Sequence, residues 1–379
     1  MIGFGIGINS VISFYMGAQD KAQADKAASQ GILLATIHGI VMTAGCIMLI
    51  KPFLCMFTND SSIVELGLQY SYIAFAFSTI LAWQLVFEKT FQAVGRMTAS
   101  MTAMLGGCIT NILLDPMLIF GIGIFPDLGI RGAAIATGIG QTVSLLVYVI
   151  IYILRPMPVR FTRKCMKPEK TLCLKMYSVG IPASLNMALP SLLISALNVI
   201  LAAFSQTYVF VLGVYYKLQT FLYLPANGVV QGMRPLIGYN YGAGEHKRVK
   251  KIYSTATIIV LIIMCAGTAI CLGIPDKLIG LFTTNANTIS AGAKALRIIS
   301  AGFIVSSVSV TASGALEGLG KGLPSLVISV FRYVVIIIPV AFILSRIYEV
   351  NGVWWSFGVT ELVTAFISYI IYKKATHHH

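Results

Sequence analysis

The residue best suited to do chemistry in this sequence is Asp115, an acid inside the apolar stretch NILLDPMLIFG at 111–121. Asn111 precedes it by four residues, so the two side chains share one face of a helix. A carboxylate and an amide oxygen are hard ligands for a small cation, and a desolvated carboxylate can alternatively carry a proton. A structural alternative is that Asp115 only bonds backbone groups loosened by Pro116. Idle carboxylates are rare in membrane segments, which favours the cation role.

Lys217 is a second ionisable residue within an apolar segment, GVYYKLQTFLYLPANG at 213–228. A buried ammonium needs an acidic partner or a hydrated cavity. We expect Lys217 to pair with Glu317 or Glu361. A structural ion pair and a role in a polar cavity or proton relay both stay open. Arg234 and Glu317 lie near segment ends, where we expect structural roles.

The elements that carry these residues are predicted to be membrane helices. Of the 379 residues, 57% are hydrophobic and 11% are charged, and the mean hydropathy is +0.85. A soluble domain carries roughly 25% charged residues. About eleven apolar segments are long enough to cross a bilayer as helices, near 1–18, 29–57, 63–94, 97–121, 131–154, 172–204, 207–240, 252–274, 287–318, 323–345 and 352–372. The fold class is therefore an all-α integral membrane protein.

The sequence also repeats itself. The stretch that begins at Gly17 answers the stretch that begins at Gly242, 225 residues later, and Gly95 answers Gly320 at the same offset. Gly132 answers Gly352 at an offset of 220. Internal symmetry of this kind is typical of secondary transporters. We predict two parallel six-helix repeats, with an N-lobe at 1–154, a cytoplasmic linker at 155–171, a C-lobe at 172–376 and a tag remnant at 377–379.

The net charge of +14 is a topology signal rather than a sign of nucleic-acid binding. Most Lys and Arg fall in one set of loops, which includes 155–170, whereas the opposite loops hold only Lys51, Arg131, Lys277 and Arg346. The positive-inside rule places the first set and the C-terminus in the cytoplasm. The first segment then starts outside. We expect an original first helix of repeat one to be absent from this polypeptide.

Other chemistry finds little support. The seven cysteines are scattered without a CxxC pair, and only His38 and His246 remain once the terminal histidines are set aside, so we expect neither a disulfide framework nor a metal site beyond Na⁺ at Asp115. The stretch GALEGLGKG at 314–322 lacks the glycine spacing and the Ser or Thr of a phosphate loop. Short loops leave no room for a soluble catalytic domain, so the chain is predicted not to be an enzyme.

Several motifs together resemble the MATE family of multidrug and toxic compound extrusion transporters, in its bacterial branch. They are GAQDKAQADKAASQG at 17–31, NILLDPMLIFG at 111–121, GIRGAAIAT at 129–137 and GVVQGMRPLIGYNYGAG at 228–244. The resemblance implies two six-helix lobes around a central cleft. It also implies antiport by alternating access, in which inward movement of Na⁺ or H⁺ drives export of amphipathic, often cationic compounds from the bacterial cytoplasm across the inner membrane.

The same resemblance implies a cation-coupling site at Asp115, Asn111 and Thr137. A second carboxylate that many members carry on the first helix has no counterpart, and 179–204 offers Asn186 and Asn198 but no acid. A substrate cavity is expected at Lys217, Tyr216, Gln219, Asn198 and Glu361. The expected partners are a small-molecule substrate and the lipid bilayer, with no nucleic acid and no cofactor besides the coupling ion, in a monomer. The alternatives are a lipid or lipid-linked oligosaccharide flippase of the same superfamily and a truncated membrane protein that does not transport.

Overall fold

The computed structural model describes residues 1–376, and every regular element in that range is helical. The all-α prediction is confirmed, whereas the tag remnant predicted at 377–379 lies outside the described residues. The chain divides into two compact units, Met1–Leu174 and the residues from Lys175 onward, here called unit 1 and unit 2.

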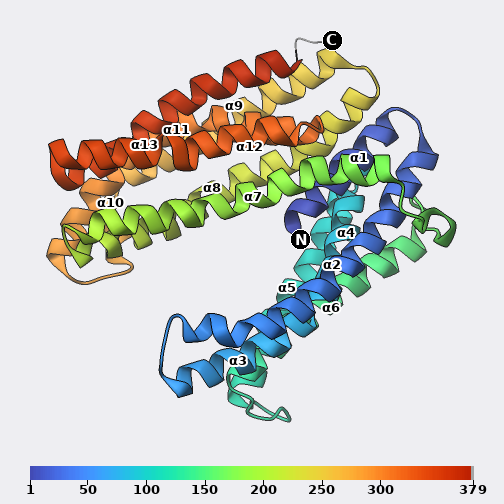
Figure 1. Ribbon diagram of the computed structural model, residues 1–379, viewed down its shortest axis with the longest axis horizontal. Helices are drawn as coiled ribbons and strands as arrows, with labels where there is room; N and C mark the ends of the chain where they lie inside the picture. Colours follow the sequence, from blue (N-terminus) through green and yellow to red (C-terminus); the bar gives the residue numbers. More distant parts are fainter. Residues whose placement is uncertain (377–379) are drawn as a thin grey trace. The chain divides into compact units, whose positions relative to one another are not determined.

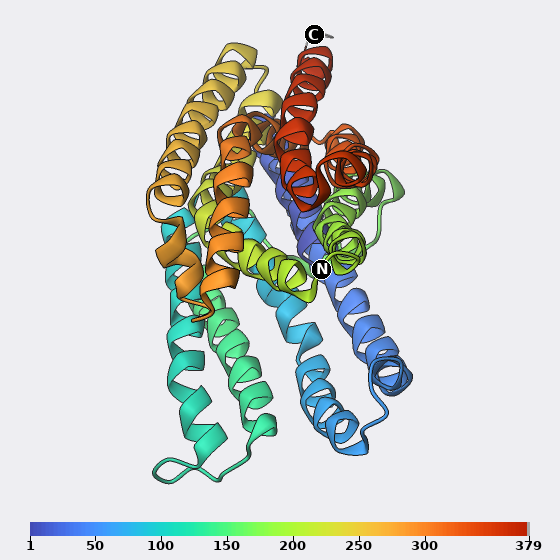
Figure 2. The ribbon, with the colours of Figure 1, turned by 90° about the vertical axis from the view of Figure 1, so that its left-hand side faces the viewer.

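Unit 1 contains two long antiparallel helix pairs and one short helix that packs on the first of them. Figure 2 shows that the turn from α2 to α3 and the turn from α5 to α6 lie at the same end of this unit. Its elements are α1 (Ile2–Gly17), α2 (Lys21–Cys55), α3 (Ser61–Ala76), α4 (Ser78–Ala93), α5 (Met97–Phe120), α6 (Ile130–Leu154) and the 3₁₀ helix η1 (Arg163–Met166). The axes of α3 and α4 meet at 46°, so the predicted segment 63–94 is one bent span.

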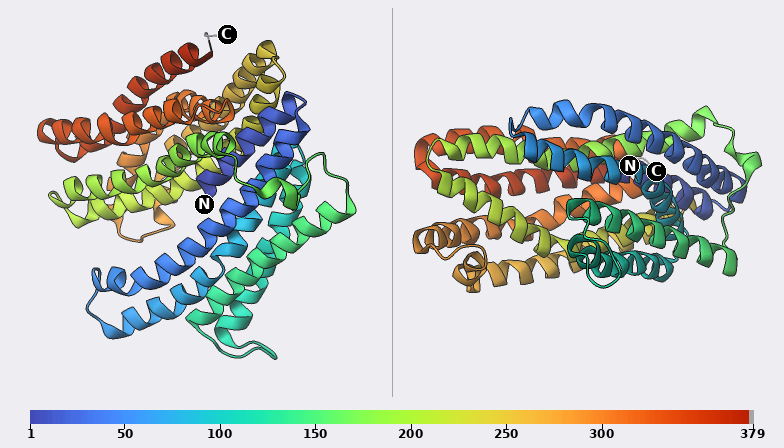
Figure 3. Two further views of the ribbon diagram at one scale, coloured as in Figure 1. Left: turned by 45° about the vertical axis from the view of Figure 1, so that its right-hand side comes forward. Right: turned by 90° about the horizontal axis from the view of Figure 1, so that it is seen from below.

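Unit 2 is built from longer helices that run side by side (Figure 1). They are α7 (Lys170–Ala202), α8 (Gln206–Gly242), α9 (His246–Gly273), the short α10 (Pro275–Gly280), α11 (Ala286–Gly318), α12 (Gly322–Val330), the π-helix η2 (Phe331–Val335) and α13 (Ile337–Thr376). The last helix folds back on itself where Tyr348 and Glu349 leave the helical conformation, and Figure 3 shows the resulting hairpin. The predicted segment 323–345 covers α12, η2 and the first arm of α13, and 352–372 lies in the second arm.

Each of the eleven predicted segments falls on a helix. Seven helices of the described chain are long and apolar enough to cross a membrane, or eight if the bent α3–α4 pair is one span. The number is below eleven for clear reasons. The helix α1 has only 16 residues, Gly322–Thr376 counts once although it holds two predicted segments, and α8 mixes Tyr, Gln and Asn with its apolar residues.

The backbone carries the marks of the predicted repeat. Eight residues of the described chain have positive φ, two of them not glycine. Six of the eight form three pairs at the predicted offsets of 225, 225 and 220: Gln19 with Gly244, Gly95 with Gly320, and Gly129 with Glu349. A Glu in this conformation is uncommon, so its match to Gly129 supports a common origin for the two turns.

Close helix contacts repeat as well. A Cβ atom on Gly132 would collide with the carbonyl of Leu118, and one on Gly352 would collide with the carbonyl of Leu344. Leu344 follows Leu118 by 226 residues, one more than the offset earlier in the repeat. The π-helix η2 lies between the two regions, and a π-bulge is how a helix absorbs one extra residue. The match therefore holds through the bulge.

The linker folds back on unit 1. Lys26 forms a 3.0 Å ion pair with Glu169, and Gln30 donates a 2.8 Å hydrogen bond to the carbonyl of Lys167. The backbone N–H of Arg160 donates to Asp25 at 2.6 Å. These bonds hold residues 160–169 against the start of α2.

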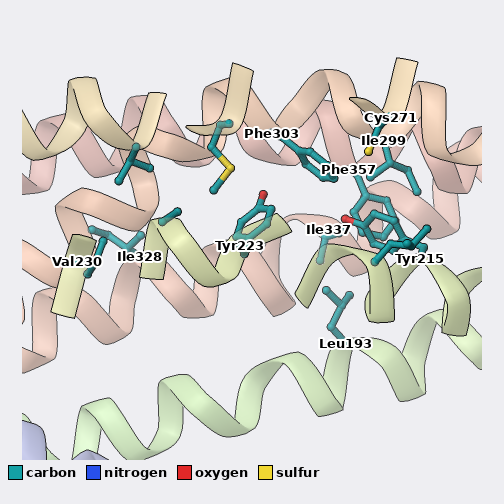
Figure 4. Packing of buried hydrophobic residues seen from close by; sticks show 14 of the residues in the cluster. Leu193, Tyr215, Tyr223, Val230, Cys271, Ile299, Phe303, Ile328, Ile337 and Phe357 are labelled. Carbon is teal, nitrogen blue, oxygen red and sulfur yellow. The ribbon is translucent and has the colours of Figure 1, made fainter. Parts of the chain in front are cut away.

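Unit 2 has the larger apolar core. Leu193 of α7, Tyr215 of α8 and Phe303 of α11 contribute to it (Figure 4). The tyrosine hydroxyls in this core need polar partners in an environment that offers few.

Candidate functional site

The three residues expected to bind a cation lie together in unit 1. The amide nitrogen of Asn111 donates to Asp115 Oδ1 at 3.3 Å and to Thr137 Oγ1 at 3.5 Å. All three side chains are half-buried. Asn111 and Asp115 are one turn apart near the C-terminal end of α5, and Thr137 lies in the second turn of α6. The i, i+4 pair was predictable from the sequence, whereas the reach to Thr137 depends on how α5 packs against α6.

Glycines bring α5 and α6 close enough for that contact. A Cβ on Gly107 of α5 would collide with the carbonyl oxygen of Gly140, and a Cβ on Gly140 would lie 2.8 Å from the carbonyl oxygen of Gly107. The two backbones are therefore in direct contact one turn from Asn111. Small residues permit such approaches between membrane helices. Thr137, one turn from Gly140, is carried toward Asn111 by the same contact.

The chemistry of this donor set suits a small hard cation or a proton. Thr137 donates its hydroxyl proton to the carbonyl of Ala133 at 3.0 Å, which leaves its lone pairs facing Asn111. One carboxylate, one hydroxyl oxygen and the amide oxygen of Asn111, after rotation of the amide, would surround Na⁺ with oxygen. Alternatively, a proton on Asp115 would neutralise the same site. The carboxylate has no hydrogen bond to the backbone in the described chain, so the purely structural alternative finds no support.

The expected ion pair of Lys217 is wrong. Lys217 is exposed on α8, and its ammonium lies 5.9 Å from the ring centroid of Phe282. Both acids expected as partners are taken by arginines, Glu317 by Arg234 and Glu361 by Arg332. Tyr216 and Leu218, the residues before and after Lys217, pack in or against the apolar core. The side chain of Lys217 therefore points away from the core.

The pair of Arg332 and Glu361 joins η2 to the second arm of α13. Both Nε, at 2.9 Å, and Nη2 of Arg332 donate to Oε1 of Glu361, and the two side chains are about 10% exposed. The guanidinium also lies 5.4 Å from the ring centroid of Tyr333. Only one carboxylate oxygen is used, because Oε2 is buried without a partner in the described residues.

The pair of Arg234 and Glu317 forms the centre of a second polar cluster in unit 2. Arg234 Nη2 lies 2.7 Å from Glu317 Oε2. Asn186 of α7 and Ser325 of α12 donate to Glu317 Oε1 at 3.1 and 3.2 Å. The cluster therefore ties α7, α8, α11 and α12 together, which agrees with the structural role expected for Arg234 and Glu317.

Unit 1 contains a matching cluster that our reading of the sequence missed. Buried Lys89 donates to Glu88 at 2.7 Å and to Gln92 at 3.1 Å, and Gln92 donates to Glu88 at 2.9 Å. Ser100 lies 3.4 Å from the Gln92 amide and 2.9 Å from the hydroxyl of Tyr148. The repeat offset was the available signal, since adding 225 to Gln92 and Ser100 gives Glu317 and Ser325.

The remaining residues expected to line a substrate cavity do not form one cluster. Tyr216 and Gln219 of α8 and Asn198 of α7 are half-buried. The hydroxyl of Tyr216 is buried without a hydrogen-bond partner in the described part of the chain. No contact joins Gln219 or Asn198 to the Arg332–Glu361 pair among the described bonds.

Known proteins match nearly the whole chain. The MatE family model matches residues 1–117 and 182–343. The multidrug export protein MepA of Staphylococcus aureus (strain NCTC 8325 / PS 47) is 26% identical over 370 residues, which cover 97% of this chain and 80% of MepA. MepA of Staphylococcus haemolyticus (strain JCSC1435) is 25% identical over 371 residues, with coverage of 98% and 81%.

Solved structures share the fold. An outward-facing multidrug resistance MATE family transporter of the MOP superfamily has a TM-score of 0.92 and 25% identity, and the match covers 99% of this chain and 84% of that one. A MATE protein in its bent conformation has a TM-score of 0.93 and 24% identity, with coverage of 99% and 83%. The family model matches well over half of the chain, and the relatives are helical membrane transporters. This chain belongs to the MatE family of multidrug efflux transporters.

Proposed function

We propose that this protein is a cation-coupled antiporter that exports amphipathic, often cationic compounds by alternating access. Binding of Na⁺ or H⁺ at Asp115, Asn111 and Thr137 drives the cycle. The observation that carries the proposal is the convergence of these three side chains on α5 and α6, with Asn111 donating to both of the others. Multidrug export by the MepA relatives supports the substrate class.

Coupling at this site follows from charge. A bound cation or proton neutralises Asp115, and the conformations that open toward opposite sides of the membrane need only differ in how well they tolerate the bare carboxylate. A ligand shifts such an equilibrium by its differential affinity for the two states. Lys217, Tyr216, Gln219 and Asn198 are proposed to contact the exported compound.

The test is export from proteoliposomes under an imposed Na⁺ or pH gradient. Asp115→Asn should abolish gradient-driven export while leaving drug binding intact, because the neutral amide cannot distinguish loaded from empty states. Asp127→Asn is the matched control, since Asp127 is an exposed acid in the turn that follows α5. Wild-type export rates in Asp115→Asn would contradict the proposal. Flipping of a labelled lipid without drug export would favour the flippase alternative.

We also propose a bacterial inner membrane location with the C-terminus in the cytoplasm, on the basis of the loop charges. Single cysteines at Lys164 and Lys250 should be shielded from an impermeant thiol reagent in intact cells, whereas cysteines at Asp127 and Lys277 should react. Labelling of position 164 from outside would overturn this orientation.

A further inference from the structure

A row of buried hydroxyls runs along the second arm of α13 with nothing to bond. Ten buried side-chain polar atoms of the described chain lack a hydrogen-bond partner, and five of them lie on α13. Four are the hydroxyls of Thr360, Thr364, Ser368 and Tyr372, which are between 0% and 7% exposed. Residues four apart share one helix face, so these hydroxyls form a continuous row.

Neighbouring serine and threonine hydroxyls of unit 2 bond their own helix instead. Ser356, one turn before Thr360 on the same row, donates to the carbonyl of Val353 at 2.6 Å. On the neighbouring α11, Ser307 and Thr311 donate to carbonyls of their own helix at 2.7 Å. A serine or threonine in these helices can therefore bond a carbonyl of its own helix. The hydroxyls of the row that follow Ser356 make no such bond.

Buried polar groups in proteins nearly always have a partner, and ordered water supplies it where protein atoms do not. Along a helix, residues four apart are about 6 Å apart. That gap matches one water molecule that makes a hydrogen bond of about 2.8 Å to each side. From Thr360 to Tyr372 the row spans about 18 Å.

An ionisable carboxylate lies near one end of the row and a surface pocket lies near the other. At one end is Glu361, which follows Thr360 in the sequence. The Oε2 atom of Glu361 is the fifth unpartnered atom of α13. At the other end, the ring of Tyr372 stacks on Tyr253 of α9 with centroids 3.9 Å apart. One turn further, Thr376 lines a surface pocket together with Lys250 of α9.

We propose that unit 2 binds a file of water molecules along α13, from Glu361 to the pocket beside Tyr372. The file gives the buried carboxylate of Glu361 a route for proton exchange with the aqueous phase at that end of the helix. A proton from the aqueous phase passes along the file and forms an O–H bond at Oε2, while Oε1 keeps its bonds from Arg332. The existence of the file is independent of the proposed transport function, and its use in coupling rests on that function.

Few charged groups act on Glu361. Arg332 of η2 is its ion-pair partner, Tyr333 follows in the same turn, and Tyr215, Tyr216 and Tyr223 of α8 lie within electrostatic range. From α11, the hydroxyl of Ser309 lies beside the Glu361 carboxylate but donates to the carbonyl of Ser306 at 3.0 Å, and a Cβ on Gly302 would lie 3.4 Å from Glu361 Cγ. Arg332 is the only one of these groups with a formal charge. Protonation of Glu361 would therefore mainly weaken its ion pair with Arg332.

The corresponding row of unit 1 is mostly satisfied, which shows that the feature does not simply follow from the fold. At an offset of 220, Thr360 and Thr364 match Gly140 and Ser144, and Ser368 and Tyr372 match Tyr148 and Tyr152. Gly140 has no hydroxyl, Tyr148 bonds Ser100, and Tyr152 accepts from the backbone of Phe161 at 3.0 Å. Only Ser144 lacks a partner there.

A crystal structure of the full chain that resolves ordered water tests the file directly. The proposal expects a water within hydrogen-bond distance of each of Thr360, Thr364 and Ser368. A dry row, with these hydroxyls turned to backbone carbonyls as in Ser356, would overturn it.

Thermal unfolding of the purified protein gives a second test in solution. Thr364→Val and Ser368→Ala should lower the melting temperature by about 1–3 °C, because hydrogen bonds to bound water are lost. If the row is dry, the same changes remove unsatisfied polar groups, and an unchanged or higher melting temperature would then refute the water file. Ser356→Ala is the matched control for loss of a satisfied intrahelical bond.

The proton route is tested separately. In proteoliposomes, Thr364→Val with Ser368→Ala should slow pH-gradient-driven export several-fold without changing the drug Kd. An unchanged rate would remove the proton route. Failure of Asp115 as the coupling residue leaves the crystallographic and melting results untouched, so the two proposals fail independently.

Discussion

The two units contain equivalent helix pairs, residues 97–154 in unit 1 and 322–376 in unit 2, but their charged groups lie in different turns. Asn111, Asp115 and Thr137 of unit 1 correspond, at offsets of 226, 226 and 220, to Ile337, Ala341 and Phe357 of unit 2. Those three residues belong to the apolar core, and Ile337 and Phe357 are visible within it in Figure 4. The turns that hold the proposed cation site in unit 1 are therefore a packed apolar layer in unit 2.

The reverse exchange occurs in the neighbouring turns. Arg332 of unit 2 corresponds to Gly107 of unit 1, and Glu361 corresponds to Gln141. Where Gly107 and Gly140 let two backbones touch, unit 2 has an arginine and Thr360. A bulky side chain in place of a glycine prevents that backbone contact. The polar row of α13 therefore begins at the position where the two helices of unit 1 touch through their backbones. Equivalent backbone positions in the two units thus carry polar residues in one unit and apolar residues or glycine in the other.

The largest expected effect comes from breaking the charge pair peculiar to unit 2. Arg332→Met leaves the carboxylate of Glu361 buried without its cation, which should cost about 3–5 kcal/mol of stability. Thermal or denaturant unfolding in detergent measures this loss. Arg346→Met is the control, because Arg346 is exposed and lies over the ring of Phe342. Adding Glu361→Gln to Arg332→Met should restore part of the stability, and equal losses in the single and double variants would contradict the pairing.

A smaller effect should follow from disturbing the backbone contact peculiar to unit 1. Gly107→Ala forces α5 away from Gly140, and overpacking of this kind costs about 1–3 kcal/mol. The displacement also separates Asn111 from Thr137, so cation affinity should fall together with stability. Gly106→Ala is the matched control, since its Cβ would meet only a Val147 methyl group at 3.7 Å. Equal unfolding midpoints for the two variants would show that the helices have room to spare.

The smallest effect is expected at Lys217. Its side chain is exposed and has no acidic partner among the described ion pairs, so Lys217→Met should change stability by less than about 0.5 kcal/mol. The midpoint of unfolding measures it. A loss comparable to that of Arg332→Met would restore the ion pair that the sequence had suggested.

The sequence predicted the helices, the repeat and the i, i+4 relation of Asn111 and Asp115, because these depend on local periodicity and on spacing along the chain. It did not predict which acid pairs with which base. Lys217 is placed outward by the packing of α8, and Arg332 lies in a π-helix whose extra residue is not visible as a pattern. The choice among Lys217, Arg234 and Arg332 is decided by tertiary packing.

The unpartnered hydroxyls of α13 illustrate the same limit. A serine or threonine in a helix sequence gives no sign of whether its hydroxyl bonds its own backbone, as in Ser356, or has no hydrogen-bond partner in the described chain, as in Thr364. At the offset of 220, Thr360 corresponds to Gly140. This difference between the two repeats was the only sign in the sequence that α13 differs from its counterpart here.

The central claim is that the cation and the exported compound are linked through Asp115. The most direct test adds a cationic drug to purified protein in weakly buffered detergent solution and measures the H⁺ or Na⁺ that is released. Linked binding requires that the drug lower the affinity for the ion as the ion lowers the affinity for the drug. Wild-type protein should release about one cation per bound drug, since the site has a single carboxylate. Asp115→Asn should bind the drug and release none, and release equal to wild type from that variant would contradict the account.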